Sequence, residues 1–135
     1  MTAFRLLRSK LERPLKFAIV GAMNTAIDIV LFTLLFYLCN IHIIIANSLS
    51  YGAGIVNSYY MNYNWTFADR KTKKESVKKI VKFIILNITS LILSTTLVYL
   101  FSIKVEEVLA KIASVIIVYG FNFFFFSRFV LKANP

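Results

Sequence analysis

Residues 17–38 read FAIVGAMNTAIDIVLFTLLFYL, a run of 22 residues with a single charged side chain, Asp28. A helix needs about 20 apolar residues to cross a bilayer, because the hydrocarbon core is about 30 Å thick and each residue rises about 1.5 Å. Three further windows meet this requirement, at residues 43–63, 83–103 and 108–129. The sequence therefore predicts an all-α membrane protein with four transmembrane helices.

The composition agrees with a membrane protein, since 59% of the 135 residues are hydrophobic and only 16% are charged. In a soluble protein, a net charge of +10 would point to nucleic acid. Here the basic residues flank the apolar windows, as they do where Lys and Arg set the orientation of a membrane protein. We therefore attribute the charge to topology and expect no nucleic-acid partner.

The basic residues are distributed unevenly between the two ends of the predicted helices. Fourteen of the sixteen lie before the first helix, between the second and third, or at the end of the fourth: Arg5, Arg8, Lys10, Arg13, Lys16, Arg70, Lys71, Lys73, Lys74, Lys78, Lys79, Lys82, Arg128 and Lys132. The opposite connections are assigned only Lys104 and Lys111, next to Glu106 and Glu107. This asymmetry predicts that both termini and the middle loop are cytoplasmic.

The chain divides into a short leading segment and one membrane domain. Residues 1–15 are expected to form a cytoplasmic interfacial helix that ends at Pro14, because Phe4, Leu7 and Leu11 share one helical face. The basic stretch 71–82 resembles a second interfacial helix. Residues 16–135 form the predicted transmembrane domain. The single cysteine, Cys39, permits no disulfide within the chain.

The membrane domain contains an internal repeat, at about 16–67 and 82–132, joined by a loop at about 68–81. Lys16-Phe17 opens the first predicted helix, and Lys82-Phe83 opens the third, 66 residues later. Asn57 and Asn122 fall late in the second and fourth helices, 65 residues apart. Each half reads as a helical hairpin, and a unit with two crossings keeps its orientation. We therefore expect two parallel hairpins related by an axis along the membrane normal.

Polar residues inside the predicted spans are the candidate functional residues, because ionisable groups at membrane depth are costly and usually serve a function. Asp28 lies near the bilayer centre, and Asn24 lies one turn before it on the same face. The other helices carry polar or small residues at helical spacing: Asn47, Ser50, Gly54 and Asn57 in the second, Asn87, Ser90 and Ser94 in the third, and Asn122, Ser127 and Arg128 in the fourth. Close helix packing is the alternative explanation for these small and amide side chains.

The repeat aligns Asp28 with Ser94 and Arg128 with Tyr63, so the acid belongs to one half and the base to the other. We hypothesise that Asp28 and the asparagines line a polar groove between the halves, and that Arg128 binds an anion at its cytoplasmic mouth. Snorkelling of Arg128 to the interface is the alternative. The sequence has no nucleotide-binding loop, metal-ligand cluster or activated nucleophile, and its only histidine, His42, reads as an interface residue. We therefore expect movement or scaffolding rather than enzyme chemistry, with no cofactor and no metal.

Several motifs resemble the GtrA-like family. They are Lys16-Phe17-x-x-Val20-Gly21 followed by Asn24-Thr25 and Asp28, the second-helix ending Asn57-x4-Asn62-x2-Trp65-x-Phe67, and the last segment, Asn122 to Val130. Where the family often has an arginine after the asparagine of the first ending, this chain has Tyr63. The resemblance covers nearly the whole chain.

This resemblance implies a role in glycosylation of bacterial surface polysaccharide or teichoic acid. Its members are thought to move a polyprenyl-phosphate-linked sugar to the outer leaflet of the cytoplasmic membrane, where a glycosyltransferase uses it. Lys16, Lys82 and Arg128 are then expected to hold the phosphate. Asn24, Asp28, Asn57, Asn62, Asn87 and Asn122 are expected to receive the sugar, and a homodimer would widen the pathway.

Two alternatives stay open. The chain could be a membrane scaffold for a separate glycosyltransferase, in which case loop residues 70–82 matter more than the membrane asparagines. It could also be a small proton-coupled exporter in which Asp28 binds protons and cationic substrates in turn.

Overall fold

Four helices make up the described part of the chain, residues 2–66 and 77–129 of a computed structural model. They are α1 (Thr2–Thr33), α2 (Ile43–Met61), α3 (Val77–Ser102) and α4 (Glu107–Phe129). Short π-helical turns extend α1 over Leu34–Leu38 and α2 over Asn62–Thr66. The predicted all-α class is confirmed; α2 and α4 begin close to their apolar windows, whereas α1 and α3 begin well before theirs.

Three segments are long and apolar enough to cross a membrane: Leu15–Leu38, Ile84–Ser102 and Glu107–Phe125. Helix α2 has 19 residues, which span about 28 Å at about 1.5 Å each. It is not among these three segments, and Asn47, Ser50 and Gly54 occupy the face that it buries. Its polar residues therefore face the bundle and not the surrounding lipid.

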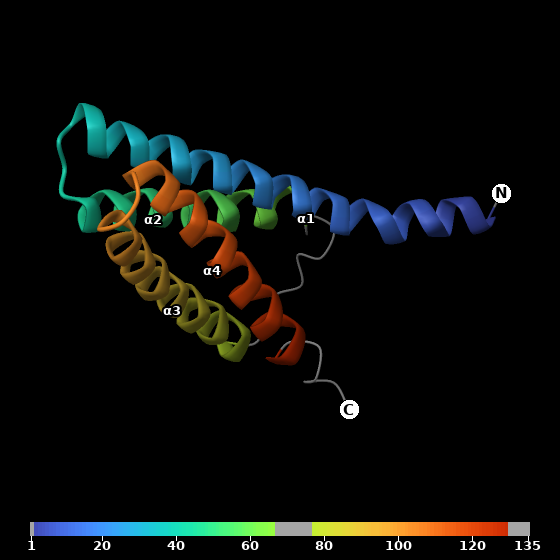
Figure 1. Cartoon of the computed structure of the whole chain (residues 1–135). Coiled ribbons are helices and arrows are strands. Elements are labelled where there is room, and N and C mark those ends of the chain that lie inside the picture. Colours follow the sequence, from blue (N-terminus) through green and yellow to red (C-terminus); the bar gives the residue numbers. More distant parts are fainter. Residues whose placement is uncertain (1, 67–76, 130–135) are drawn as a thin grey trace.

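The helices form two hairpins, α1–α2 and α3–α4, whose short connections lie at the same end of the bundle (Figure 1). We call this the connection end; it comprises residues 39–42 and 103–106. The hairpins meet there and diverge toward the other end, which we call the terminal end (Figure 1). The two hairpins therefore run in parallel, as the repeat predicts.

The connection end is held by local hydrogen bonds. Asn40 adopts a left-handed backbone conformation, with φ of 50°, which asparagine tolerates better than most residues. His42 caps α2, and its Nδ1 accepts a hydrogen bond from the backbone N–H of Ile44 at 3.4 Å. Across the hairpins, the hydroxyl of Tyr37 donates to Glu107 Oε2 at 3.1 Å.

The N-terminal segment differs from its prediction. Pro14 was expected to end a separate interfacial helix, but α1 continues through Pro14 as one helix of 32 residues. Proline removes one backbone hydrogen bond without necessarily ending a helix, and the apolar segment that follows it is itself strongly helical. The first turns of α1 project beyond the bundle at the terminal end (Figure 1). Of the predicted interfacial segment 71–82, residues 71–76 lie outside the described residues, and residues 77–82 form the start of α3.

Burial in the bundle is the reverse of that in a soluble protein. Large apolar side chains such as Val56, Ile92 and Ile116 are at least 62% exposed, as expected of a lipid-facing surface. The fully buried positions include an apolar group around Phe32 and Val98 and a polar group of serines, Asn47 and Lys111. The polar residues of this bundle are therefore inside it.

The two hairpins are also equivalent in their contacts. Within the first, the Asn57 amide donates to Asn24 Oδ1 at 2.7 Å. Within the second, Ser90 donates to Asn122 Oδ1 at 2.5 Å, and these two residues follow Asn24 and Asn57 by 66 and 65 positions. Buried Asp28 and Ser94, like buried Phe32 and Val98, are also 66 residues apart.

Candidate functional site

A buried ion pair lies at the centre of the bundle. The ammonium of Lys111, on α4, donates to Asp28 Oδ1 of α1 at 2.7 Å and to Asn47 Oδ1 of α2 at 2.6 Å. The side chain of Lys111 is fully buried, and that of Asp28 is 9% exposed. Three helices therefore converge on one ammonium group.

Further hydrogen bonds extend this pair into a cluster that includes the remaining helix. Ser50 donates to the same Asp28 oxygen at 2.7 Å. The Asn47 amide nitrogen lies 3.3 Å from Ser94 Oγ and 3.0 Å from Thr95 Oγ1, both on α3. The hydroxyl oxygens of Ser94 and Ser114 lie 3.2 Å apart. We call these residues the central cluster: Asp28, Asn47, Ser50, Ser94, Thr95, Lys111 and Ser114.

The spacing of small residues in the sequence makes this convergence possible. Asn47, Ser50 and Gly54 lie at i, i+3 and i+7 on α2, so one narrow face of the helix carries all three. A Cβ added at Gly54 would lie 3.5 Å from the carbonyl oxygen of Asn24 and 4.0 Å from Asp28 Cβ. Because α1 and α2 approach so closely here, Ser50 reaches the Asp28 carboxylate directly.

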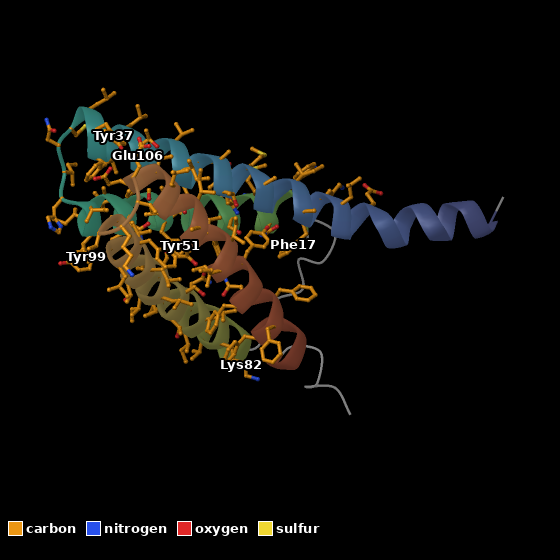
Figure 2. The ribbon with its side chains drawn as sticks, in the orientation of Figure 1. Phe17, Tyr37, Tyr51, Lys82, Tyr99 and Glu106 are labelled. Carbon is orange, nitrogen blue, oxygen red and sulfur yellow. The ribbon has the colours of Figure 1, made fainter. Side chains whose placement is uncertain are left out.

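A second polar level lies toward the terminal end. It contains the pairs Asn24–Asn57 and Ser90–Asn122, each within one hairpin. Tyr51 of α2, in the first hairpin, interacts with Ser90 and Asn122 of the second. Figure 2 shows Tyr51 inside the bundle, whereas Lys82 and Tyr99 lie at its outside. The described interior is therefore polar over at least two levels.

The electrostatics of the central cluster are those of a low-dielectric interior. A lone charge there would be costly, whereas an ion pair with good geometry and additional hydrogen bonds is tolerated. Asp28 and Lys111 cancel each other's charge, and Ser50 and Asn47 add hydrogen bonds to each. The ring of Phe32, with its centroid 5.4 Å from the Lys111 nitrogen, adds a cation–π contact. The pair is neutral overall and holds both hairpins together.

The structure brings several of the predicted site residues together in the interior. Asn24, Asp28, Asn57 and Asn122 line the two polar levels. Asn62 donates to Ser58 at 3.1 Å near the terminal end. Asn87 is half-buried on α3, three residues before Ser90.

The predicted phosphate-binding cations are placed differently. Lys16 pairs with Glu12 at 2.8 Å and lies 5.8 Å from the ring centroid of Trp65. Lys82 is exposed. Arg128 belongs to α4, but its side chain lies outside the described part of the structure. The structure thus provides a cation in the interior that the prediction did not include.

That cation is Lys111, and the prediction that it lies in a connection between helices was wrong. Its position near the start of the fourth apolar window assigned it to the connection with Lys104, but it is fully buried one turn inside α4. Two sequence signals could have identified it. It lies within the apolar window, and Lys111, Ser114, Val118 and Asn122 are spaced along one helical face. With Lys111 removed from the connection, the asymmetry of basic residues between the two ends increases.

A shallow apolar groove follows the contact between α1 and α4. It encloses about 580 Å³ and is lined by Ala18, Ala22, Thr25, Ala26, Ile29, Val115, Ile116 and Tyr119. Thr25 and Ile29 flank Asp28 along α1, and Val115 lies one turn after Lys111. Neither Asp28 nor Lys111 lines the groove itself, but its lining residues neighbour both along α1 and α4. In the described parts of the chain, no three His, Cys, Asp or Glu side chains group together as metal ligands.

Comparisons with known proteins agree with this architecture. Residues 16–131 match the family described as "GtrA/DPMS, transmembrane domain". The chain is also 41% identical over 98 residues to "Uncharacterized membrane protein YngA" of Bacillus subtilis (strain 168), a match that covers 73% of this chain and 64% of that protein. The chain thus spans less than two thirds of the length of this curated relative. No solved structure matches the chain significantly.

Proposed function

Because the chain belongs to the GtrA/DPMS transmembrane-domain family, we propose that it moves a polyprenyl-phosphate-linked sugar across the bacterial cytoplasmic membrane. The sugar would then be used to glycosylate a surface polysaccharide or teichoic acid. One observation carries the proposal: a bundle with an apolar exterior encloses two levels of amides, hydroxyls, a carboxylate and an ammonium.

The interior suits the headgroup of such a lipid. A sugar presents several hydroxyls, each of which donates and accepts hydrogen bonds, and burying one without a partner costs about 1–3 kcal/mol. Amides such as those of Asn24, Asn57 and Asn122 offer both donors and acceptors. The prenyl chain needs no protein pathway, because it can stay in the bilayer during the crossing.

The uneven distribution of basic residues supports an orientation with the terminal end in the cytoplasm. In this orientation Lys16, Lys82 and Arg128 would attract the phosphate, Asn62 and Asn87 would receive the headgroup, and the central cluster would lie in the outer half of the bilayer. A glycosyltransferase at the outer face is the expected partner.

Reconstitution in liposomes tests the proposal. The purified protein is incorporated into vesicles with a polyprenyl-phosphate hexose, and arrival of the hexose in the opposite leaflet is measured over time. We expect wild type to accelerate the crossing over protein-free vesicles, and Asp28→Asn or Arg128→Ala to abolish the acceleration. Thr96→Ala is the matched control, since Thr96 is exposed and bonds only its own helix at Ile92.

Well-folded wild type that moves no lipid would overturn the proposal. In that case a scaffold for a separate glycosyltransferase becomes the better explanation, and co-purification of such an enzyme with the chain would be measured next.

A further inference from the structure

We propose that Lys111 is the binding site for the lipid phosphodiester inside the membrane, and that Asp28 occupies this site when no lipid is bound. This inference rests on the proposed function, because it assigns the phosphate-binding role to one residue of the same pathway. It adds a phosphate-binding residue to the predicted cations at the cytoplasmic face, Lys16, Lys82 and Arg128.

The charges of the two anions support an exchange. The diester that joins a sugar to a polyprenol carries one negative charge, as the Asp28 carboxylate does. Exchanging one for the other leaves Lys111 neutralised, whereas an uncompensated ammonium in the interior would be strongly destabilising. The ammonium is a compact charge with three rotatable donors, so it can accept either anion without a fixed bidentate geometry.

The hydrogen bonds at the pair leave donor and acceptor capacity for a ligand. Those of Lys111 go to Asp28 and Asn47, which engage two of its three protons. The bonds to Asp28 both go to Oδ1, from Lys111 and Ser50. Of the two charged side chains, only that of Asp28 has any exposed surface. The carboxylate is therefore the partner that can turn away.

A sugar attached to the phosphate would compensate the displaced carboxylate. Sugar hydroxyls are donors, and a carboxylate accepts up to about four hydrogen bonds. A phosphate at Lys111 and a hydroxyl at Asp28 thus satisfy both members of the pair with one ligand. The chemistry selects a glycosylated phosphodiester over a bare phosphate.

The groove between α1 and α4 supplies the access route. It is apolar and open, and its lining residues Thr25, Ile29 and Val115 lie within one helical turn of Asp28 or Lys111 along their helices. The prenyl chain of the bound lipid is its proposed occupant, because the chain is apolar, like the groove, and is continuous with the phosphate. Capture of the phosphate also breaks the ion pair between α1 and α4, which frees the hairpins to move apart.

Binding in detergent micelles tests the inference without requiring transport. The probe is a radiolabelled short-chain prenyl-phosphate hexose, compared with a neutral prenyl hexoside and with free hexose 1-phosphate. If Asp28 competes with the phosphate, the two charged residues have opposite effects. Asp28→Asn is expected to bind the probe at least about tenfold more tightly, and Lys111→Gln at least about tenfold more weakly.

Controls separate competition from a structural role. Asp28→Ser copies the residue at the equivalent repeat position, Ser94, and serves if Asp28→Asn does not fold. The uncharged double variant Asp28→Asn/Lys111→Gln should bind as weakly as Lys111→Gln alone, and Thr96→Ala should bind as wild type does. The neutral hexoside should bind all variants alike.

The inference would be overturned if the Asp28 and Lys111 substitutions both weakened binding of the probe, or if neither changed it. Hexose 1-phosphate that binds as tightly as the lipid probe would assign the site to a soluble phosphate and would overturn the lipid assignment. If wild type transports the lipid but the variants bind the probe as wild type does, this inference is overturned and the proposed function stands. If the Asp28 and Lys111 substitutions change binding in opposite directions but wild type transports no lipid, the proposed function is overturned and this inference stands.

Discussion

Replacing Lys111 by methionine is expected to destabilise the bundle far more than replacing Lys111 and Asp28 together. Within the described residues, the single substitution leaves a carboxylate in the interior with the hydrogen bond from Ser50 alone, and leaves Asn47 Oδ1 without the ammonium. Removing one member of a buried ion pair typically costs about 3–5 kcal/mol. We expect the lower part of this range, about 3 kcal/mol, because helices unfolded within a membrane environment find other polar partners.

The double variant Asp28→Asn/Lys111→Met should recover most of this loss. It removes both charges, and replacing a whole buried pair by neutral residues is often neutral or even stabilising. The double-mutant cycle therefore predicts a coupling free energy of about 3 kcal/mol between the two positions. The free energy of unfolding is measured in mixed micelles by denaturing-detergent titration followed by circular dichroism.

The same chain offers a matched control. Lys16 and Glu12 form an ion pair of similar length, 2.8 Å, but their side chains are 27% and 53% exposed. A cycle with Lys16→Met and Glu12→Gln should give a coupling of only about 0.3–0.5 kcal/mol, as for exposed helical pairs. Equal coupling in the two cycles, or less than about 0.5 kcal/mol for Asp28 and Lys111, would refute the reasoning that burial makes this pair strong.

Three further predictions follow from other features. Asn47→Leu should lower the free energy of unfolding by about 2 kcal/mol, because it removes one of two hydrogen bonds to Lys111, and the same denaturation assay measures this. Gly54→Ala should be tolerated, since the added Cβ makes ordinary contacts, whereas Gly54→Leu should wedge α1 from α2 at about 1–3 kcal/mol; equal melting temperatures would contradict this. Exposed Cys39 should react with a membrane-impermeant maleimide in intact cells, whereas Asn64→Cys in a Cys39→Ser background should react only after permeabilisation; the reverse pattern would invert the orientation.

The helical frame could be predicted from the sequence because membrane burial depends on runs of residues rather than on single contacts. A window of about 20 apolar residues has few alternatives to a spanning helix. Asp28 and Asn24 were recognisable for the same reason, since a polar group in such a window is conspicuous. The equivalence of Asn57 and Asn122 followed from their spacing alone.

Lys111 could not be placed by the same reasoning. A lysine near the end of an apolar window reads as an interfacial residue, and its helical spacing with Ser114, Val118 and Asn122 indicates a polar face without identifying its partner. That partner is Asp28, 83 residues earlier in the chain. Similarly, local sequence did not show that α1 continues through Pro14, because proline weakens a helix by an amount that the surrounding helical segment can offset.

The near-equivalence of the two hairpins has a consequence for how such a pair can arise. A dimer of identical hairpins repeats every contact on both sides of its axis, so it would contain this ion pair twice or not at all. Here Ser94 stands where the second hairpin would repeat Asp28, and the pair occurs once. A single, directional dipole in the interior thus requires two halves that have diverged from each other, as the two halves of this chain have. The ligand that it orients would then bind in one direction only.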